Sequence, residues 1–252
     1  MTHIIDLEGK VALVTGGSRG IGLTICEHLA AAGADVAFTY HPNEMEPSIA
    51  CETIEVHGRR SLALAADVSD SEIAATCFST VESELGSVDI LVCNAGIVRD
   101  SVLWKASKSE WDEVLSVNLS GAFNYLNQLA IQARKNPQPR SVVLISSING
   151  IRGKFAQTAY SASKSGLIGL GRSAAKDLGK WGTRVNIVAP GMVLTELTDS
   201  LPKEIIQNAK NETLDGRLTK VSDVADAVLF LSSEMSEHIT GVVLPVDGGQ
   251  LL

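Results

Sequence analysis

The sequence contains few aromatic residues and no long apolar segment. Phe, Trp and Tyr make up 4% of the 252 residues and apolar residues 45%, so the core must consist mainly of Val, Ile, Leu and Ala. No apolar run approaches the ~20 residues that a membrane-spanning helix needs. Residues 1–10 also lack the basic and apolar regions of a signal peptide. We therefore expect a cytoplasmic protein with no membrane partner.

Cysteine is also scarce, and negative charge exceeds positive charge. Cys26, Cys51, Cys77 and Cys93 show no metal-ligand spacing, and each falls within a predicted helix or strand. They are expected to be reduced, packed thiols, with neither disulfides nor a metal site. The formal net charge of −8 argues against a nucleic-acid partner, because phosphates repel an acidic surface. A local basic patch could still bind an anionic cofactor.

Short apolar runs alternate with amphipathic helical patterns along the whole chain. Strands are predicted at residues 11–14, 34–40, 61–65, 89–93, 142–145, 184–188 and 242–246. Helices are predicted at about 45–57, 70–85, 107–134, 158–178 and 222–231, with Asp70 and Ser222 as N-caps. This alternation predicts an α/β fold, a Rossmann-type doubly wound parallel sheet flanked by helices. No linker or repeat interrupts it, so residues 1–252 are expected to form one domain.

A glycine-rich segment follows the first predicted strand and leads into a helical pattern. Strand, glycine-rich turn and helix together direct backbone N–H groups and a helix N-terminus at a phosphate. A glycine-rich loop alone could be a structural turn, but this context favours dinucleotide binding. The candidate phosphate-binding residues are Gly16, Ser18, Arg19, Gly20, Ile21 and Gly22.

The end of the second predicted strand bears on the choice of cofactor. NAD-binding folds commonly place an acidic residue there for the ribose 2′-hydroxyl, but this strand ends in Tyr40 and His41. Arg19 could instead pair with a 2′-phosphate. We therefore predict NADP(H) in preference to NAD(H), which stays an alternative, as does Arg19 as a solvated surface residue.

Three residue types with acid–base potential follow further along the chain. Ser147 comes directly after an apolar strand, where ligands bind in open α/β sheets. Tyr160 and Lys164 are four residues apart, so in a helix they share one face, and an ammonium can lower the pKa of a nearby phenol. Taken alone, this pair could be a surface helix pair, and Asn118 in a helix interior could be a packing residue.

Taken in order, these landmarks resemble the short-chain dehydrogenase/reductase family over essentially the whole chain. The resemblance rests on Thr15-Gly16-x-x-x-Gly20-x-Gly22, Asp67, Asn94-Ala95-Gly96, Asn118, Ser147, Tyr160-x-x-x-Lys164 and Pro190-Gly191-x-x-x-Thr195. Within the family, the chain looks most like bacterial 3-oxoacyl thioester reductases. Segments 94–100, 146–150 and 157–160 are similar to those of acetoacetyl-CoA reductases in particular.

The resemblance implies specific roles for these residues. Tyr160 would be the general acid, Ser147 would bind the carbonyl oxygen, Lys164 would hold the nicotinamide ribose and lower the Tyr160 pKa, and Asn118 would hold a water for reprotonation. The implied cofactor contacts beyond the glycine loop are Tyr40, Asp67, Val68, Asn94, Ala95, Gly96, Tyr160, Lys164, Pro190, Gly191, Val193 and Thr195.

The implied activity is NADPH-dependent reduction of a 3-oxoacyl thioester, with residues 195–217 as a substrate lid. Trp181 stands where carrier-protein reductases often have a basic residue, which leaves acyl carrier protein or coenzyme A open as the thioester carrier. Arg99 and Lys105 could suit a coenzyme A phosphate or be solvated charges. A broader carbonyl reductase for a ketone, sugar or steroid and a non-catalytic dinucleotide-binding protein are the alternatives.

Assembly is also expected from the resemblance, which implies a homotetramer paired through the helices that contain Asn118 and Tyr160. The second of these helices contains Gly166, Gly169 and Gly171. Glycines at this spacing suggest close packing against another helix or subunit.

Overall fold

The computed structural model describes residues 5–43, 47–194 and 202–252. Its centre is one parallel sheet with the strand order β3-β2-β1-β4-β5-β6-β7. The strands are β1 (Val11–Thr15), β2 (Asp35–Tyr40), β3 (Ser61–Ala65), β4 (Ile90–Cys93), β5 (Arg140–Ile145), β6 (Thr183–Pro190) and β7 (Val243–Val246). The predicted doubly wound α/β fold is confirmed.

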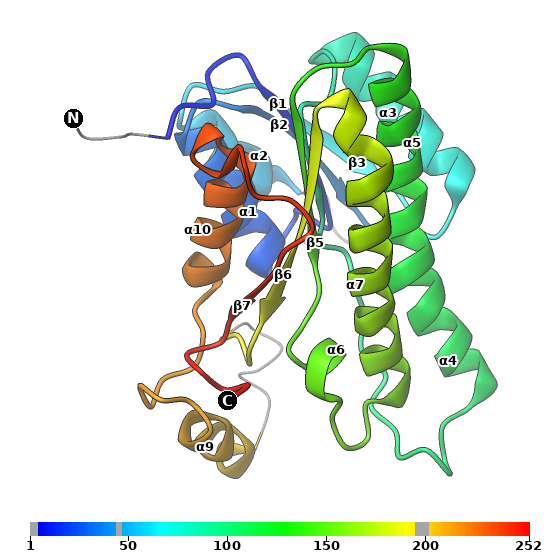
Figure 1. Ribbon diagram of the computed structural model, residues 1–252, viewed down its shortest axis with the longest axis vertical. Helices are drawn as coiled ribbons and strands as arrows, with labels where there is room; N and C mark the ends of the chain where they lie inside the picture. The colour runs from blue at the N-terminus through cyan, green and yellow to red at the C-terminus, as the bar shows by residue number, and fades with distance from the viewer. Residues whose placement is uncertain (1–4, 44–46, 195–201) are drawn as a thin grey trace.

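Helices cover both faces of the sheet (Figure 1). One face carries α1 (Gly20–Ala31), α2 (Ser48–Glu55) and α10 (Val221–Ser232); the other carries α3 (Ser71–Glu84), α5 (Gly121–Lys135) and α7 (Thr158–Leu178). Successive β1 residues alternate between the two cores: Leu13 packs with the α3, α5 and α7 side, and Val14 with the α1 and α10 side. Period-2 alternation in a sheet covered on both faces explains why the strands are apolar throughout.

The sheet changes its winding direction at β1. This strand pairs with β2 on one side and β4 on the other, with Val11 opposite Asp35 and Thr15 opposite Cys93. The loops that leave the carboxyl ends of β1 and β4 therefore lie next to each other. Open α/β sheets bind ligands at such a switch point.

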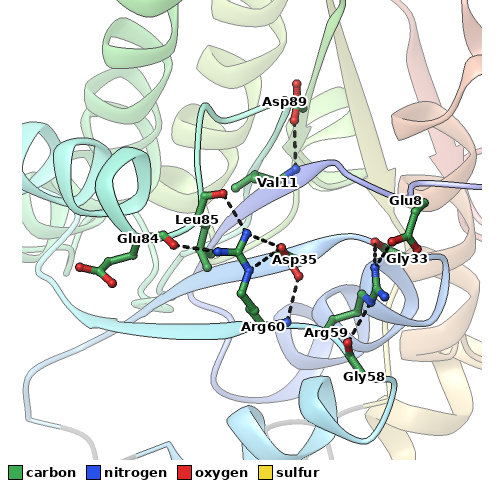
Figure 2. Close-up of polar contacts among 10 residues, drawn as sticks. All are labelled: Glu8, Val11, Gly33, Asp35, Gly58, Arg59, Arg60, Glu84, Leu85 and Asp89. Atoms are coloured by element: carbon green, nitrogen blue, oxygen red, sulfur yellow. Dashed lines mark hydrogen bonds and ion pairs between the residues drawn. The ribbon is translucent and has the colours of Figure 1, made fainter.

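The opposite, amino-terminal edge of the sheet is held by charged side chains (Figure 2). Arg60 donates to the Asp35 carboxylate at 2.8 Å and to two carbonyls at the end of α3. Arg59 pairs with Glu8 at 2.8 Å, and the Asp89 carboxylate accepts from the first backbone N–H of β1 at 3.0 Å. These contacts join the starts of neighbouring strands, and they leave the carboxyl edge to the candidate site.

The helical pattern predicted at 107–134 is confirmed, with one interruption. Ser107 caps α4 (Lys108–Leu115) through a reciprocal capping box with Glu110. A π-helical turn (Ser116–Ser120) then separates α4 from α5. Such π turns are rare in proteins, but those that do occur often lie at functional sites. This one contains Asn118.

The three glycines of α7 have different surroundings. A Cβ at Gly166 would lie 2.8 Å from the Leu119 side chain, and one at Gly171 would lie 2.8 Å from Ile187. A Cβ at Gly169 would have no neighbour within 4 Å. Two of the glycines therefore permit close packing within the chain, onto the π-helical turn and onto β6.

The two predicted helix caps have different outcomes. Asp70 caps α3, since its carboxylate accepts from Glu72 N at 2.8 Å. Ser222 is not a cap, because α10 begins one residue earlier, and the Asp223 carboxylate accepts from the backbone N–H of Lys220 at 2.9 Å. The carboxylate of Asp223, the third residue of α10, thus bonds the start of the helix in place of the predicted Ser222 hydroxyl.

The segment predicted as a lid contains one described helix, α9 (Lys203–Asn211). It lies beside the C-terminal segment at the lower end of the molecule in Figure 1, near the short helix α6 (Asn149–Arg152). Residues 195–201 of the predicted lid lie outside the described residues. Across the described ranges, no helix combines the length and apolarity that crossing a membrane requires.

The four cysteines are free thiols, as predicted. Burial raises the pKa of Cys93 to about 12, and it raises the pKa of Cys26 still further above its ordinary value. Both thiols therefore stay protonated and unreactive near neutral pH. Within 5–43, 47–194 and 202–252, no group of three or more His, Cys, Asp or Glu side chains could hold a metal ion.

Candidate active site

The predicted serine, tyrosine and lysine come together where the carboxyl end of β5 lies next to the first turns of α7. Ser147 is the second residue after β5, and its Oγ accepts from Asn149 N at 3.1 Å. The Ser147 hydroxyl is also close enough to the Tyr160 phenol to lower the pKa of that phenol. Lys164 follows one turn later on α7, with Nζ 5.7 Å from the centroid of the Tyr160 ring. The helical spacing read from the sequence therefore produces a real cluster of side chains.

The pKa of Tyr160 moves in the opposite direction to the one expected. Burial raises it above its ordinary value, the hydrogen bond from Ser147 lowers it, and the nearby Asp100 carboxylate raises it. Lys164 is not among the causes of this shift, so the expected lowering of the Tyr160 pKa by Lys164 stays a prediction. Burial is the largest cause of the shift, because it penalises the charged phenolate, and the phenol is held in its protonated form.

Lys164 is almost fully buried, with 4% of its surface exposed. Its Nζ donates a 2.8 Å hydrogen bond to the carbonyl oxygen of Ile145, the last residue of β5. Burial lowers the Lys164 pKa from 10.5 to about 8. The ammonium is therefore anchored on the sheet and titrates close to neutral pH.

Asn118 is buried in the π-helical turn, and both ends of its carboxamide are bonded. Oδ1 accepts from Ile97 N at 2.7 Å, while Nδ2 donates to Ile97 O at 2.9 Å and to Ser163 Oγ at 3.1 Å. The side chain thus fixes the loop after β4 against α7. A Cβ at Gly96 would lie 3.3 Å from Asn118 Oδ1 and 3.4 Å from Lys164 Nζ, so these three residues converge.

The glycine loop follows β1 and is built by close backbone approaches. Gly16 and Gly20 have positive φ angles of 66° and 54°. A Cβ at Gly22 would lie 2.0 Å from Gly16 O, and one at Gly17 would lie 2.5 Å from the Phe38 Cβ. Only glycine fits these positions, so Gly17, which was not among the predicted site residues, also shapes the loop.

Asn94 and Thr15 join the loops after β1 and β4. Asn94 Nδ2 donates to Thr15 O at 3.1 Å and to Gly16 O at 2.9 Å, so its carboxamide contacts the glycine loop. Thr15 Oγ1 accepts from the backbone N–H groups of Asn94 and Ala95 at 3.0 and 3.1 Å. Thr15 was not predicted as a site residue. Its position at the end of β1, directly before the glycine loop, could have indicated that role.

The other predicted contacts of the adenosine half surround the same edge. The Asp67 carboxylate accepts from Ser69 Oγ at 2.7 Å, and the hydrogen bonds from Ser69 lower the Asp67 pKa. Val68 is buried, and its carbonyl accepts from Asn124 on α5 at 3.1 Å. Arg19 directly precedes α1 and is exposed, and Tyr40 ends β2.

The loop after β6 completes the set. Pro190 O accepts from Ile148 N at 3.0 Å, beside Ser147, and Gly191 N donates to Val246 O at 3.0 Å. Val193 is buried and forms an isolated parallel bridge with Thr219. Thr195, the predicted contact of the carboxamide, lies outside the described residues.

Of the two cations considered for a coenzyme A phosphate, Arg99 is already paired. Its guanidinium donates to the Glu113 carboxylate at 2.7 and 3.0 Å, so a fork-to-fork ion pair holds it against α4. Lys105 is exposed, on the loop between β4 and α4.

Comparison with known proteins agrees with this geometry. A family model described as enoyl-(acyl carrier protein) reductase matches residues 16–250. A 3-oxoacyl-(acyl-carrier-protein) reductase of Staphylococcus aureus is 37% identical over 243 residues, covering 96% of this chain and 98% of its own length. The Aquifex aeolicus protein of the same description is 39% identical over 245 residues, covering 97% and 98%.

A solved structure is similarly close. The crystal structure of a putative short-chain alcohol dehydrogenase from Sinorhizobium meliloti superposes with a TM-score of 0.93, at 37% identity and 99% coverage of both chains. The fold, the clustered residues and these relatives define an NAD(P)-dependent oxidoreductase that acts on CH–OH groups. Within that class, the chain belongs to the short-chain dehydrogenase/reductase family.

Proposed function

We propose that the protein uses NADPH to reduce a 3-oxoacyl thioester to the 3-hydroxyacyl product. The observation that carries the proposal is the cluster of Ser147, Tyr160 and Lys164, with Asn118 beside it, next to the glycine loop. The names of the Staphylococcus and Aquifex relatives support the substrate class. A nicotinamide cofactor would supply the hydride that adds to the carbonyl carbon.

The residues of the chain would handle the proton. Tyr160 donates its phenolic proton to the carbonyl oxygen as that oxygen gains charge, and Ser147 donates a hydrogen bond to the same oxygen. The raised pKa of Tyr160, caused mainly by burial, keeps this acid protonated between turnovers. Lys164, held by Ile145 O, would bind the ribose hydroxyls of the cofactor. Asn118 would hold the water through which Tyr160 recovers its proton.

NADPH is proposed over NADH because of two features at the adenosine end. β2 ends in Tyr40 without an acidic residue for a ribose 2′-hydroxyl. Arg19, exposed at the start of α1, offers a guanidinium for a 2′-phosphate. NADH remains the alternative cofactor, and comparing the two dinucleotides under the same conditions decides between them.

A second candidate function is a broader carbonyl reductase or secondary-alcohol dehydrogenase. The printed description of the Sinorhizobium structure as a putative short-chain alcohol dehydrogenase favours it. The family description names instead an enoyl reductase, which would reduce a C=C bond. The deciding assay follows NADPH oxidation with acetoacetyl-CoA, a carrier-bound 3-oxoacyl group, crotonyl-CoA and a panel of plain ketones. Fast ketone reduction without thioester turnover would overturn the first proposal, as would turnover of crotonyl-CoA alone.

We also propose that copies of the chain associate as a tetramer and work in the cytoplasm. A groove of about 670 Å³ runs between α5 and α7, lined in part by the half-exposed Phe123 and by Trp181. Apolar grooves of this kind are common at contacts between subunits. Light scattering of the purified protein tests the mass, and a monomer would contradict the proposal. Cell fractionation tests the location.

The thioester carrier could be acyl carrier protein or coenzyme A. Carrier proteins are acidic and dock on basic groups. Near the groove, Lys180 Nζ lies 4.6 Å from the centroid of the Trp181 ring, so its charge is close to the position that lacks a basic residue. Comparing kcat/KM for the same acyl group on both carriers identifies the preferred one.

A further inference from the structure

Gln250 lies buried where three segments of the chain meet near the candidate site. Its side-chain Oε1 accepts from Met192 N at 3.0 Å, and its Nε2 donates to Glu212 Oε2 at 2.9 Å. Its backbone carbonyl accepts from the Arg152 guanidinium at 3.0 Å. One residue thus contacts the loop after β6, the end of α9 and the end of α6.

Glu212 connects two of these contacts. The oxygen that accepts from Gln250 also accepts from Arg152 Nη2 at 2.9 Å. The hydrogen bonds from Gln250 and Arg152 lower the Glu212 pKa, so the carboxylate is ionised and both hydrogen bonds are charge-assisted. An exposed Arg–Glu ion pair alone contributes little to folding stability. Here the pair also holds the buried carboxamide of Gln250.

A carboxamide is the side chain that this place requires. One end must accept from a backbone N–H, and the other must donate to a carboxylate; Glu could do only the first and Met neither. The approach is close, because a Cβ on Gly191 would lie 2.7 Å from Gln250 Oε1. The glycine next to Met192 therefore admits the carboxamide.

We propose that Gln250 is a positioning residue that fixes the Met192 backbone for cofactor binding and couples it, through Glu212, to the segment after α9. The proposal rests on the proposed function, for which Pro190, Gly191 and Val193 on either side of Met192 are predicted cofactor contacts. In this arrangement, the end of α9 and the Met192 backbone are held by one hydrogen-bonded unit.

The first test compares the Kd of NADPH, by fluorescence titration, for the wild type, Gln250→Glu, Glu212→Gln and the double variant. Gln250→Glu keeps the acceptor for Met192 but faces Glu212 with a second carboxylate, so we expect affinity to fall roughly tenfold. The double variant restores a donor facing an acceptor and should bind within about twofold of the wild type. Glu8→Gln, which removes the partner of Arg59 at the other edge of the sheet, is the control and should change nothing.

Two outcomes overturn the proposal. Unchanged affinity in Gln250→Glu would show that Gln250 does not position the loop, and a double variant as weak as Gln250→Glu would remove Glu212 from the coupling. Thermal unfolding of each variant separates these results from misfolding.

A second measurement stands apart from cofactor binding. Amide hydrogen exchange of the peptide that contains Met192 should be at least tenfold faster in Gln250→Met than in the wild type, because the Met192 N–H loses its acceptor. Equal exchange would overturn the positioning role. If the wild type bound neither NADPH nor NADH, the proposed function would fail, while the exchange result would still decide whether Gln250 holds Met192.

Discussion

The Lys164 ammonium lies 5.7 Å from the centroid of the Tyr160 ring. The phenol does not set the position of this ammonium, because Lys164 Nζ donates a 2.8 Å hydrogen bond to Ile145 O, the last carbonyl of β5. The ring is positioned by α7 and the ammonium by the sheet. The arrangement of these two groups therefore depends on how α7 packs on β5, and the first two predictions test each group separately.

Tyr160→Phe should reduce turnover by roughly 10²- to 10⁴-fold, the contribution typical of a general acid. The ring and its packing remain, so the Kd of NADPH should change by less than about twofold, because no cofactor contact of comparable strength is lost. Steady-state kinetics and fluorescence titration measure the two quantities. Retained turnover would remove Tyr160 from the role of acid.

Lys164→Met should abolish activity and yet stabilise the fold at pH 7. The lowering of the Lys164 pKa from 10.5 to about 8 corresponds to roughly 3 kcal/mol of destabilisation by the buried charge. Loss of the hydrogen bond to Ile145 O offsets about 1 kcal/mol of the gain. Urea unfolding at pH 7 should therefore show a higher free energy of unfolding for the variant.

The pH dependence of that difference gives a second check on Lys164. Because the folded-state pKa lies below the ordinary value, the unfolded chain binds more protons between pH 8 and 10.5. The destabilisation is fully present below pH 8 and disappears as the pH rises towards 10.5. The advantage of Lys164→Met should shrink over that window, and a constant difference would contradict the assigned cause.

Arg19→Ala should raise the KM of NADPH about tenfold or more, as expected for the loss of a charge-assisted contact with a phosphate. The KM of NADH should hardly change, since NADH has no 2′-phosphate. Arg59→Ala, at the opposite edge of the sheet, is the matched control. An equal response of both cofactors would show that Arg19 does not recognise the 2′-phosphate.

Gly22→Ala and Gly169→Ala form a matched pair of glycine substitutions in helices. At Gly22 the new methyl group would lie 2.0 Å from Gly16 O, so the glycine loop must shift and cofactor affinity should fall by more than tenfold. At Gly169 the methyl group meets nothing within 4 Å, and alanine should stabilise α7 by about 0.5–1 kcal/mol. Titration with NADPH and thermal unfolding measure both effects. Comparable losses in the two variants would contradict the loop argument.

The strands, their alternation with helices and the sheet class could be predicted because each depends on local periodicity. The apolar run at 61–65 and the capping Asp70 correspond to β3 and to the start of α3 as predicted. The π-helical turn at Asn118 was not predicted, because the pattern at 107–134 was interpreted as one continuous α-helix. Ser222 was wrongly predicted to cap α10, because the neighbouring residue Asp223 carries the carboxylate that bonds the start of this helix.

Properties that depend on burial and long-range pairing were less accessible. The direction of the Tyr160 pKa follows from desolvation, which needs the packed structure. The pairing of Arg99 with Glu113 spans a loop and a helix. In the Arg152–Glu212–Gln250 network, Arg152 lies 60 positions from Glu212, and Gln250 lies 38 positions from it. No sequence motif connects these three residues.

The charged contacts of Arg59 and Arg60 lie at the amino-terminal edge, and the candidate site lies at the carboxyl edge. A five-residue strand such as β1 separates the two edges by ~16 Å. Free-energy changes at sites this far apart usually add without interaction. The substrate range could therefore be redesigned at one edge, while the stability lost in the process is restored by substitutions at the other.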